Sequence, residues 1–179
     1  MTVLNALGAG TAVTWGADTQ PDGDIRSALA DAQLASGVYP NRGLMGLVAW
    51  NLRRSAYEGG DKAGSFAGLA KTPADVAADL MLGDLRIDKA IFQATKTAKQ
   101  RIVGSTVYGF LAYDGLSKDD PSHMKQFFTT PLGSAGRFRV FRRQFGPAEK
   151  LLEIIIEHYD NILGTSTVGF ARLNVSPAT

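Results

Sequence analysis

Hydrophobic and polar positions follow two periods along this chain, and together they predict alternating strands and helices. The stretch "TAVTW" at residues 11–15 predicts a short strand. After a polar loop, apolar residues recur at helical spacing from Ile25 to Ala35, which predicts a helix. Asp24 is suited to cap the start of this helix, and Gly37 is suited to end it.

The middle of the chain continues this alternation. Residues 44–48 predict a strand that passes directly into a helix, and the glycine-rich stretch at 58–68 predicts a surface loop. A further helix is indicated by "KTPADVAADLML", in which Thr72 can cap and Asp75, three residues later, favours the helix dipole. Gly83 is expected to end that helix.

The second half of the chain favours strands. Residues 84–94 and 101–114 alternate or are rich in β-branched and aromatic residues, which predicts two strands with one buried face. Residues 114–136 are rich in turn-forming residues and predict a long surface loop. Two more strands are expected around residues 146–147, and a last one at 168–175. The sum is an α+β fold in which strands predominate.

The composition of the chain excludes several kinds of chemical site. The 179 residues are 45% hydrophobic, enough for one substantial core. There is no cysteine, which excludes disulfides, thiolate metal sites and cysteine nucleophiles. Lys and Arg number 19 against 17 Asp and Glu, a balance that argues against a protein whose main task is to grip nucleic acid. No run of eighteen apolar residues predicts a membrane span.

The trio His158, Tyr159 and Asp160 ends an apolar run and raises the question of a metal or catalytic site. Strand alternation places His158 on the more apolar face and Tyr159 on the other. His158 and Asp160 supply two ligands, whereas catalytic zinc takes three from the protein, and the other histidine, His123, falls in the predicted loop. Local hydrogen bonding or a contact across an interface is therefore favoured over a metal site.

No known catalytic motif is present. The chain has neither a Gly-x-Ser-x-Gly elbow nor a phosphate-binding Gly-x-x-x-x-Gly-Lys loop. Glu153 and Glu157 share a strand face, a spacing compatible with acid-base work, but solvated surface charges are the favoured interpretation. We expect no enzyme activity, no catalytic residue, no metal and no cofactor.

The segment "RFRVFRRQF", residues 137–145, interleaves arginines with aromatic and apolar residues. Such a pattern suits single-stranded nucleic acid, through backbone contact and stacking. It also suits a strand that meets a neighbouring subunit, since arginine and aromatics are enriched at interfaces. Alternation predicts Phe138 and Val140 in the core and Arg137, Arg139 and Phe141 outside. The interface interpretation is favoured because the whole chain is not basic.

The order of the segments resembles a known family. "WGADTQPDGDI", "SGVYPNRGLM", "TPADVAADLM", "IDKAIFQAT", "STVYGFLAYDG", "DDPS", "GRFRVFRR" and "EIIIEHYDNILGTSTVGFARL" look like the C-terminal portion of a tailed-phage major capsid protein of the Hong Kong 97-like fold. The resemblance covers nearly all of residues 1–179 as one capsid-like unit. It implies an axial domain over about 16–135 and long strands returning towards the peripheral domain over about 136–179. The family's N-terminal arm, extended loop and spine helix have no counterpart here, so no cross-linking chemistry is carried over.

The resemblance implies a structural subunit of a phage or prophage icosahedral capsid, made in the cytoplasm of a bacterial host and located in the virion. Its partners would be its own copies in pentamers and hexamers, packaged DNA contacted without sequence preference, and scaffold, portal or decoration proteins, with no membrane. Two alternatives stay open: a nucleic-acid-binding module using the strand 137–143, and a cellular nanocompartment shell of the same fold. A small hydrolase or metal enzyme using His158 and Asp160 is a further, less favoured hypothesis. The candidate subunit-interface residues are Arg137, Arg139, Arg142, Arg143, Glu153, Glu157, His158 and Tyr159.

Overall fold

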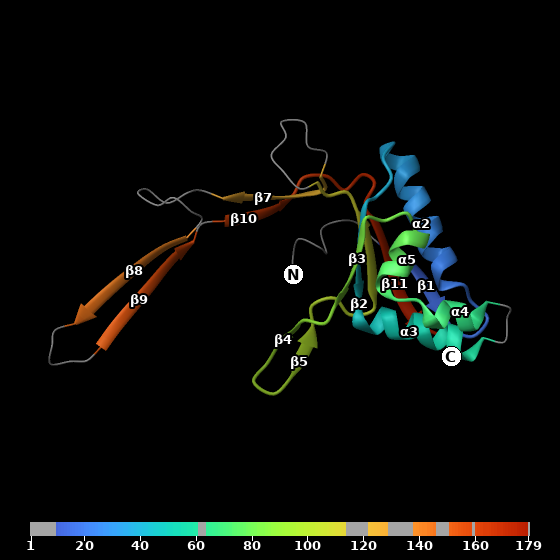
Figure 1. Ribbon diagram of the computed structural model, residues 1–179, viewed down its shortest axis with the longest axis horizontal. Helices are drawn as coiled ribbons and strands as arrows, with labels where there is room; N and C mark the ends of the chain where they lie inside the picture. Colours follow the sequence, from blue (N-terminus) through green and yellow to red (C-terminus); the bar gives the residue numbers. More distant parts are fainter. Residues whose placement is uncertain are drawn as a thin grey trace. The chain divides into compact units, whose positions relative to one another are not determined.

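A five-stranded mixed sheet organises the first of the two units into which the chain divides (Figure 1). The structure is a computed structural model that describes residues 10–60, 64–113, 122–128, 138–145, 151–158 and 160–178. Met1–His123 and Thr165–Thr179 form the first unit, and Met124–Gly164 forms the second. Because each unit makes most of its contacts within itself, each is described separately.

The sheet of the first unit has the strand order β1-β11-β6-β2-β3. β1 pairs with β11 and β2 with β3 in parallel, whereas β6 pairs antiparallel with both β11 and β2. The predicted strand at 11–15 is confirmed, and so is the passage from strand to helix near residue 46. The strands are β1 (Thr11–Trp15), β2 (Arg42–Gly46), β3 (Asp84–Asp88), β6 (Thr106–Phe110) and β11 (Ala171–Pro177).

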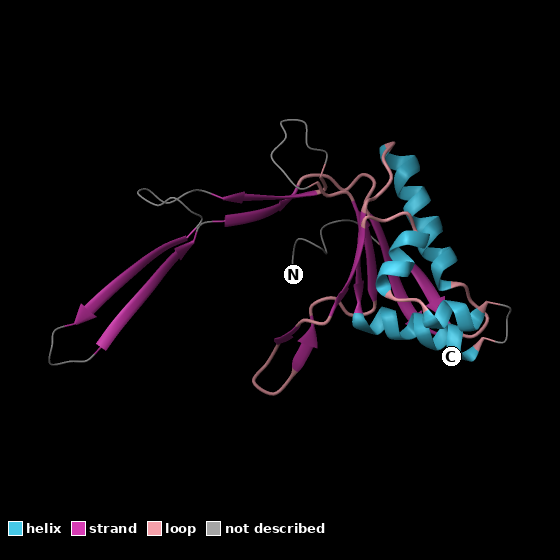
Figure 2. Cartoon of the chain, in the orientation of Figure 1, coloured by secondary structure: helices cyan, strands magenta, loops and turns pink. Residues whose placement is uncertain are grey.

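Four helices belong to the described part of this unit, and Figure 2 shows them grouped along one side of the sheet. Their apolar residues meet those of the sheet in one hydrophobic core, because each helix has one buried stripe and each strand presents alternate residues to it. The helices are α2 (Pro21–Ser36), α3 (Leu47–Gly59), α4 (Ser65–Ala70) and α5 (Pro73–Asp79). The most buried core residues include Trp15, Ile25, Leu29, Met45, Ala49, Val76, Leu80, Val107 and Leu173.

Helix α2 begins earlier than the sequence predicts. Its N-cap is Gln20, which makes no side-chain capping bond, and Pro21 occupies the first helical position. The expected cap, Asp24, lies instead in the first turn, where its carboxylate accepts a hydrogen bond of 2.9 Å from Nε1 of Trp15. The expected end at Gly37 is confirmed, because this residue has φ 77° and donates its N–H to the carbonyl of Gln33.

Helix α5 confirms the capping signal. The Thr72 hydroxyl accepts from the Asp75 N–H at 3.3 Å, and the Asp75 carboxylate accepts from the Thr72 N–H at 2.8 Å. The helix ends at Asp79 with Leu80 as its C-cap, earlier than the expected stop at Gly83. The preceding glycine-rich stretch was predicted to be a loop, but its last part forms α4, whose Gly68 packs against the ring of Tyr57.

Two predicted strands are four strands in the structure. Residues 84–94 divide into β3 and β4 (Ile91–Gln93), and residues 99–110 divide into β5 (Lys99–Arg101) and β6. β4 and β5 pair antiparallel as a small hairpin that is separate from the main sheet. At both breaks the Asp88 carboxylate bonds to the backbone, accepting from the Ala90 N–H at 3.1 Å and from the Val103 N–H at 3.0 Å.

The second unit consists of two two-stranded antiparallel sheets, β7–β10 and β8–β9. The predicted strands around residues 146–147 are confirmed as β8 and β9. β7 lies where a loop was predicted, and the other residues of that loop, apart from 122–123, lie outside the described residues. The bounds are β7 (Met124–Phe128), β8 (Phe138–Phe145), β9 (Leu151–His158) and β10 (Asp160–Gly164).

The mixed α and β composition agrees with the predicted α+β class. The last strand, β11, pairs with β1 and belongs to the first unit, so the chain returns to its first sheet after the second unit. The assignment of residues 16–135 and 136–179 to axial and peripheral domains stays a prediction.

Candidate functional site

The β8–β9 hairpin contains most of the residues that the sequence suggests for an interface. Its register sets Arg139 opposite Glu157 and Arg143 opposite Glu153. Strand alternation puts both of these oppositions on one face of the hairpin, with Phe141 opposite Ile155 between them. Opposite charges facing each other across two strands stabilise a register, so the sequence of the two strands is matched to this pairing.

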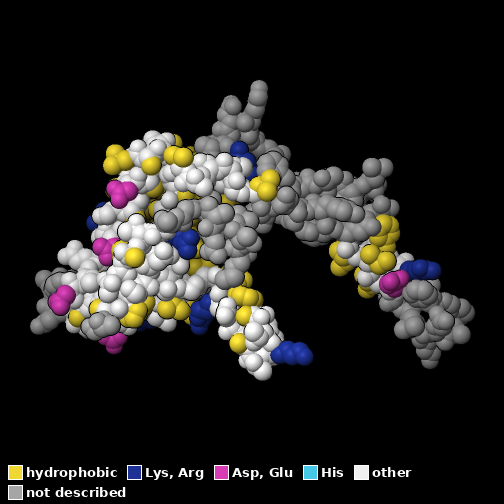
Figure 3. Space-filling view, turned by 180° about the vertical axis from the view of Figure 1, so that it is seen from behind, with side chains coloured by type: hydrophobic (Ala, Val, Ile, Leu, Met, Phe, Trp, Pro, Cys, Tyr) yellow, Lys and Arg dark blue, Asp and Glu magenta, His cyan; other side chains and the backbone are white. Residues whose placement is uncertain are grey.

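The apolar residues of this hairpin are exposed. Val140, Ile154 and Ile156 are 54%, 56% and 63% exposed, and Ile155 on the opposite face is 43% exposed. Figure 3 shows hydrophobic side chains beside basic and acidic ones on the described part of the hairpin. The prediction that Val140 lies in the core is therefore wrong. Alternation assigned it to a face correctly, but no described element forms a second layer over that face.

The remaining interface candidates differ in how far the structure describes them. Arg142, Arg143 and Glu153 are exposed. For Arg139, Glu157 and His158 the strand positions are described but the side chains are not, and His158 stands opposite Phe138 at the end of β9. Arg137 and Tyr159 lie outside the described residues. The interface role of all eight stays a prediction.

His123 lies in the predicted loop segment, outside the helices and strands and directly before β7, but it is buried rather than at the surface. His123 is only 4% exposed, and its Nδ1 accepts a hydrogen bond of 2.9 Å from the Leu111 N–H. Nε2 therefore carries the proton and donates to the carbonyl of Val168 at 2.8 Å. Burial lowers the pKa of His123, against the opposing effect of the Val168 carbonyl.

Both ring nitrogens of His123 are thus engaged, and neither is available to a metal. In the part of the chain that the structure describes, no group of three or more His, Cys, Asp or Glu side chains could hold a metal ion. Nor does any described helix have the length and hydropathy that a membrane crossing requires.

A buried ion pair in the first unit was not predicted from the sequence. Arg53 is 0% exposed, and its Nε and Nη2 donate to the two carboxylate oxygens of Asp22 at 2.6 and 2.9 Å. The guanidinium lies 5.0 Å from the ring centroids of both Trp50 and Tyr57. Its Nη2 also donates to the carbonyl of Gly68, so this one side chain joins α2, α3 and α4.

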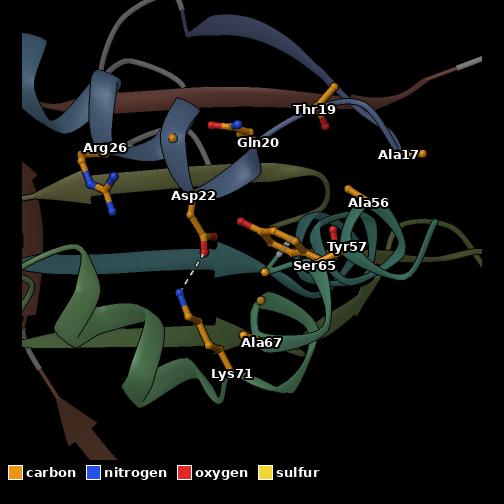
Figure 4. Close-up of a pocket in the computed structure, with 13 residues that line it drawn as sticks. Ala17, Thr19, Gln20, Asp22, Arg26, Ala56, Tyr57, Ser65, Ala67 and Lys71 are labelled. Carbon is orange, nitrogen blue, oxygen red and sulfur yellow. Dashed lines mark ion pairs between the residues drawn. The ribbon is translucent and has the colours of Figure 1, made fainter. Parts of the chain in front are cut away.

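The ion pair borders a cavity of about 410 Å³ (Figure 4). Lys71 extends along its wall with Nζ 3.8 Å from the Asp22 carboxylate, and it also pairs with Asp79. Burial alone would raise the pKa of Asp22, but the hydrogen bond and charge of Arg53 outweigh it, so this pKa is lowered. The carboxylate is held in its ionised form by two cations, which suits a structural link better than proton transfer.

One sequence signal could have revealed this pair. The buried residues of α3 are Ala49, Arg53 and Ala56, spaced as one helical stripe. An arginine in an otherwise small and apolar stripe needs a buried counter-ion.

Comparisons with known proteins define the fold. No known family model matches this chain, and no curated protein does either. Among solved structures, a phage-related protein from Bordetella bronchiseptica RB50 is similar with a TM-score of 0.71 and 14% identity, over 93% of this chain and 55% of that one. A proposed prophage capsid protein of Escherichia coli CFT073 matches with a TM-score of 0.39 and 12% identity, over 88% of this chain and 48% of that one.

This chain therefore shares its fold with a phage-related protein, and it spans about half the length of both similar structures.

Proposed function

We propose that this chain is part of a structural subunit of a phage or prophage capsid. The observation that carries the proposal is the fold shared with a phage-related protein over 93% of the chain. The segment order of the sequence, which resembles Hong Kong 97-like major capsid proteins, points the same way. The proposed role is structural rather than enzymatic.

In finer detail, we propose that the first unit corresponds to the axial domain of that fold, and that copies associate into pentamers and hexamers enclosing DNA. A shell subunit needs surfaces that contact neighbouring copies in a head-to-tail manner and close into rings. The exposed apolar residues of the β8–β9 hairpin supply one such surface, since exposed apolar patches on soluble proteins are typical of interaction sites. The proposed location is the virion.

The alternative of a nucleic-acid-binding module receives less support. β8 has three arginines, but two of them stand opposite glutamates of β9. A strand whose charges are matched within its own hairpin attracts a phosphate backbone less than an uncompensated basic strand would.

The native mass of the purified chain, measured by light scattering over a concentration series, tests the proposal. Electron micrographs of the same fractions identify the particles. We expect ring-sized or shell-sized assemblies whose share rises with concentration, with the most dilute sample as the monomer reference. A mass that stays at 19.1 kDa throughout, with no particles in the micrographs, would contradict the proposal.

A further inference from the structure

Each strand of the β8–β9 hairpin leaves one edge without a strand partner among the described residues. β8, "FRVFRRQF", has three arginines and no acidic residue, whereas β9, "LLEIIIEH", has two glutamates and no lysine or arginine. The two open edges of one hairpin therefore carry opposite charges.

We propose that the β9 edge of one copy of this chain pairs antiparallel with the β8 edge of the next copy, in the register already used within the hairpin. This inference rests on the proposed function and names a contact by which subunits associate.

A two-stranded hairpin with exposed apolar residues on both faces is incomplete by itself. Isolated hairpins are marginally stable in water, and three or more strands with a shared apolar face are needed for independent stability. Open edges also present unpaired N–H and C=O groups in a row. Pairing with a second hairpin satisfies one edge of each copy and extends the apolar face of Val140, Ile154 and Ile156 across both hairpins.

Charge selects this head-to-tail contact over a symmetric one. An antiparallel contact between two β9 strands centred on Ile155 would set Glu153 of one copy opposite Glu157 of the other, and a contact between two β8 strands would combine six arginines with no acid. Pairing β9 with β8 of the next copy instead repeats the Arg139–Glu157 and Arg143–Glu153 oppositions. Such a contact leaves an open edge at each end, so it can continue from copy to copy and close into a ring.

Disulfide cross-linking between introduced cysteines tests this contact directly, because the chain has no cysteine of its own. Val140 stands opposite Ile156 in the register, so the proposed contact brings Val140 of one copy opposite Ile156 of the next. Opposed antiparallel residues have Cα atoms about 4.5–5.5 Å apart, a distance that a disulfide spans.

A chain with Val140→Cys and a size-tagged chain with Ile156→Cys are mixed and oxidised. We expect the mixed disulfide dimer to exceed both homodimers. Val168→Cys, at a 55% exposed position in the first unit, is the matched control and should give only slow, statistical cross-linking. Equal or greater yields of the two homodimers would overturn the inference.

Charge reversal then separates the inference from the proposed function. In the variant Arg139→Glu, Arg143→Glu, Glu153→Arg, Glu157→Arg, every opposition within the hairpin is kept with its sign reversed. We expect this variant to assemble alone as the unchanged chain does. A tagged unchanged chain should nevertheless co-purify much less of the variant than of itself, because like charges meet at both edges of a mixed contact.

The possible results of these experiments distinguish failure of the hairpin contact from failure of the capsid proposal. Free mixing of the two chains, or failure of the variant alone to assemble, overturns the hairpin contact while the capsid proposal stands. Failure of both chains to assemble contradicts the capsid proposal, and the disulfide yields then decide the hairpin contact by themselves.

Discussion

The main sheet and the β8–β9 hairpin use the same kinds of side chain in opposite surroundings. In the sheet, Met45 is 0% and Leu173 3% exposed, because helices and neighbouring strands cover them. In the hairpin, Ile154 and Ile156 are each more than half exposed. The first unit holds its apolar residues in a core of its own, whereas the hairpin has the sequence of a buried strand and no described cover. That difference motivates the proposal that the hairpin is completed by another copy of the chain.

The two regions also differ in their charge pairs, and this difference gives the largest predicted effect. Asp22→Ala is expected to lower the free energy of unfolding by about 3–5 kcal/mol, because Arg53 stays buried without its counter-ion. Glu153→Ala removes an exposed charge in the hairpin and should cost at most about 1 kcal/mol. Urea unfolding followed by tryptophan fluorescence measures the first unit, which contains both Trp15 and Trp50.

The double variant Asp22→Leu, Arg53→Met is the control for that prediction. It removes both charges together and should recover much of the lost stability. A loss of under about 1 kcal/mol for Asp22→Ala would show that the pair is not the buried link described.

Replacing apolar side chains by alanine tests the same difference between the main sheet and the hairpin. Leu29→Ala, at a position 1% exposed, should cost about 2–5 kcal/mol in the unfolding of the first unit. Ile156→Ala in the hairpin should change it by no more than about 0.5 kcal/mol. The same urea titrations check both values. Similar losses at the two positions would mean that Ile156 contributes to a core after all.

The smallest effect is a pH dependence confined to the first unit. Because the pKa of His123 is lowered from its ordinary value of 6.5, the unfolded chain binds a proton there that the folded chain does not. Stability is therefore fully present above about pH 6.5 and is lost as pH falls towards the folded pKa. Urea titrations between pH 7.5 and 5 measure the slope, and His123→Gln should flatten it. An unchanged slope in that variant would assign the dependence to other groups.

Local signals in the sequence predicted local structure well. The capping box at Thr72 and the left-handed stop at Gly37 depend only on residues within one turn, so sequence was sufficient. The short strands β7 and β10 were missed because they pair with each other from distant parts of the chain, whereas α4 was missed because its glycine-rich surroundings predict a loop and its packing against α3 is not visible in the sequence. The burial of His123 was missed for the same reason as the two strands, since it bonds to Val168, 45 residues away.

The β8–β9 hairpin shows what strand alternation in the sequence can predict and what it cannot. Alternation identified β8 and β9 and the faces of their residues, and the register could have been inferred from the order of arginines and glutamates. It could not show whether a second layer covers Val140, because burial depends on the whole fold rather than on the strand.

Hydrogen exchange at low and high protein concentration tests the central claim most directly. The backbone amides of the main sheet should be protected at both concentrations, because the first unit has its own core. The amides of β8 and β9 should gain protection as assemblies form, because each edge then acquires a strand partner. Assembly without any change of exchange in β8 and β9 would contradict the account.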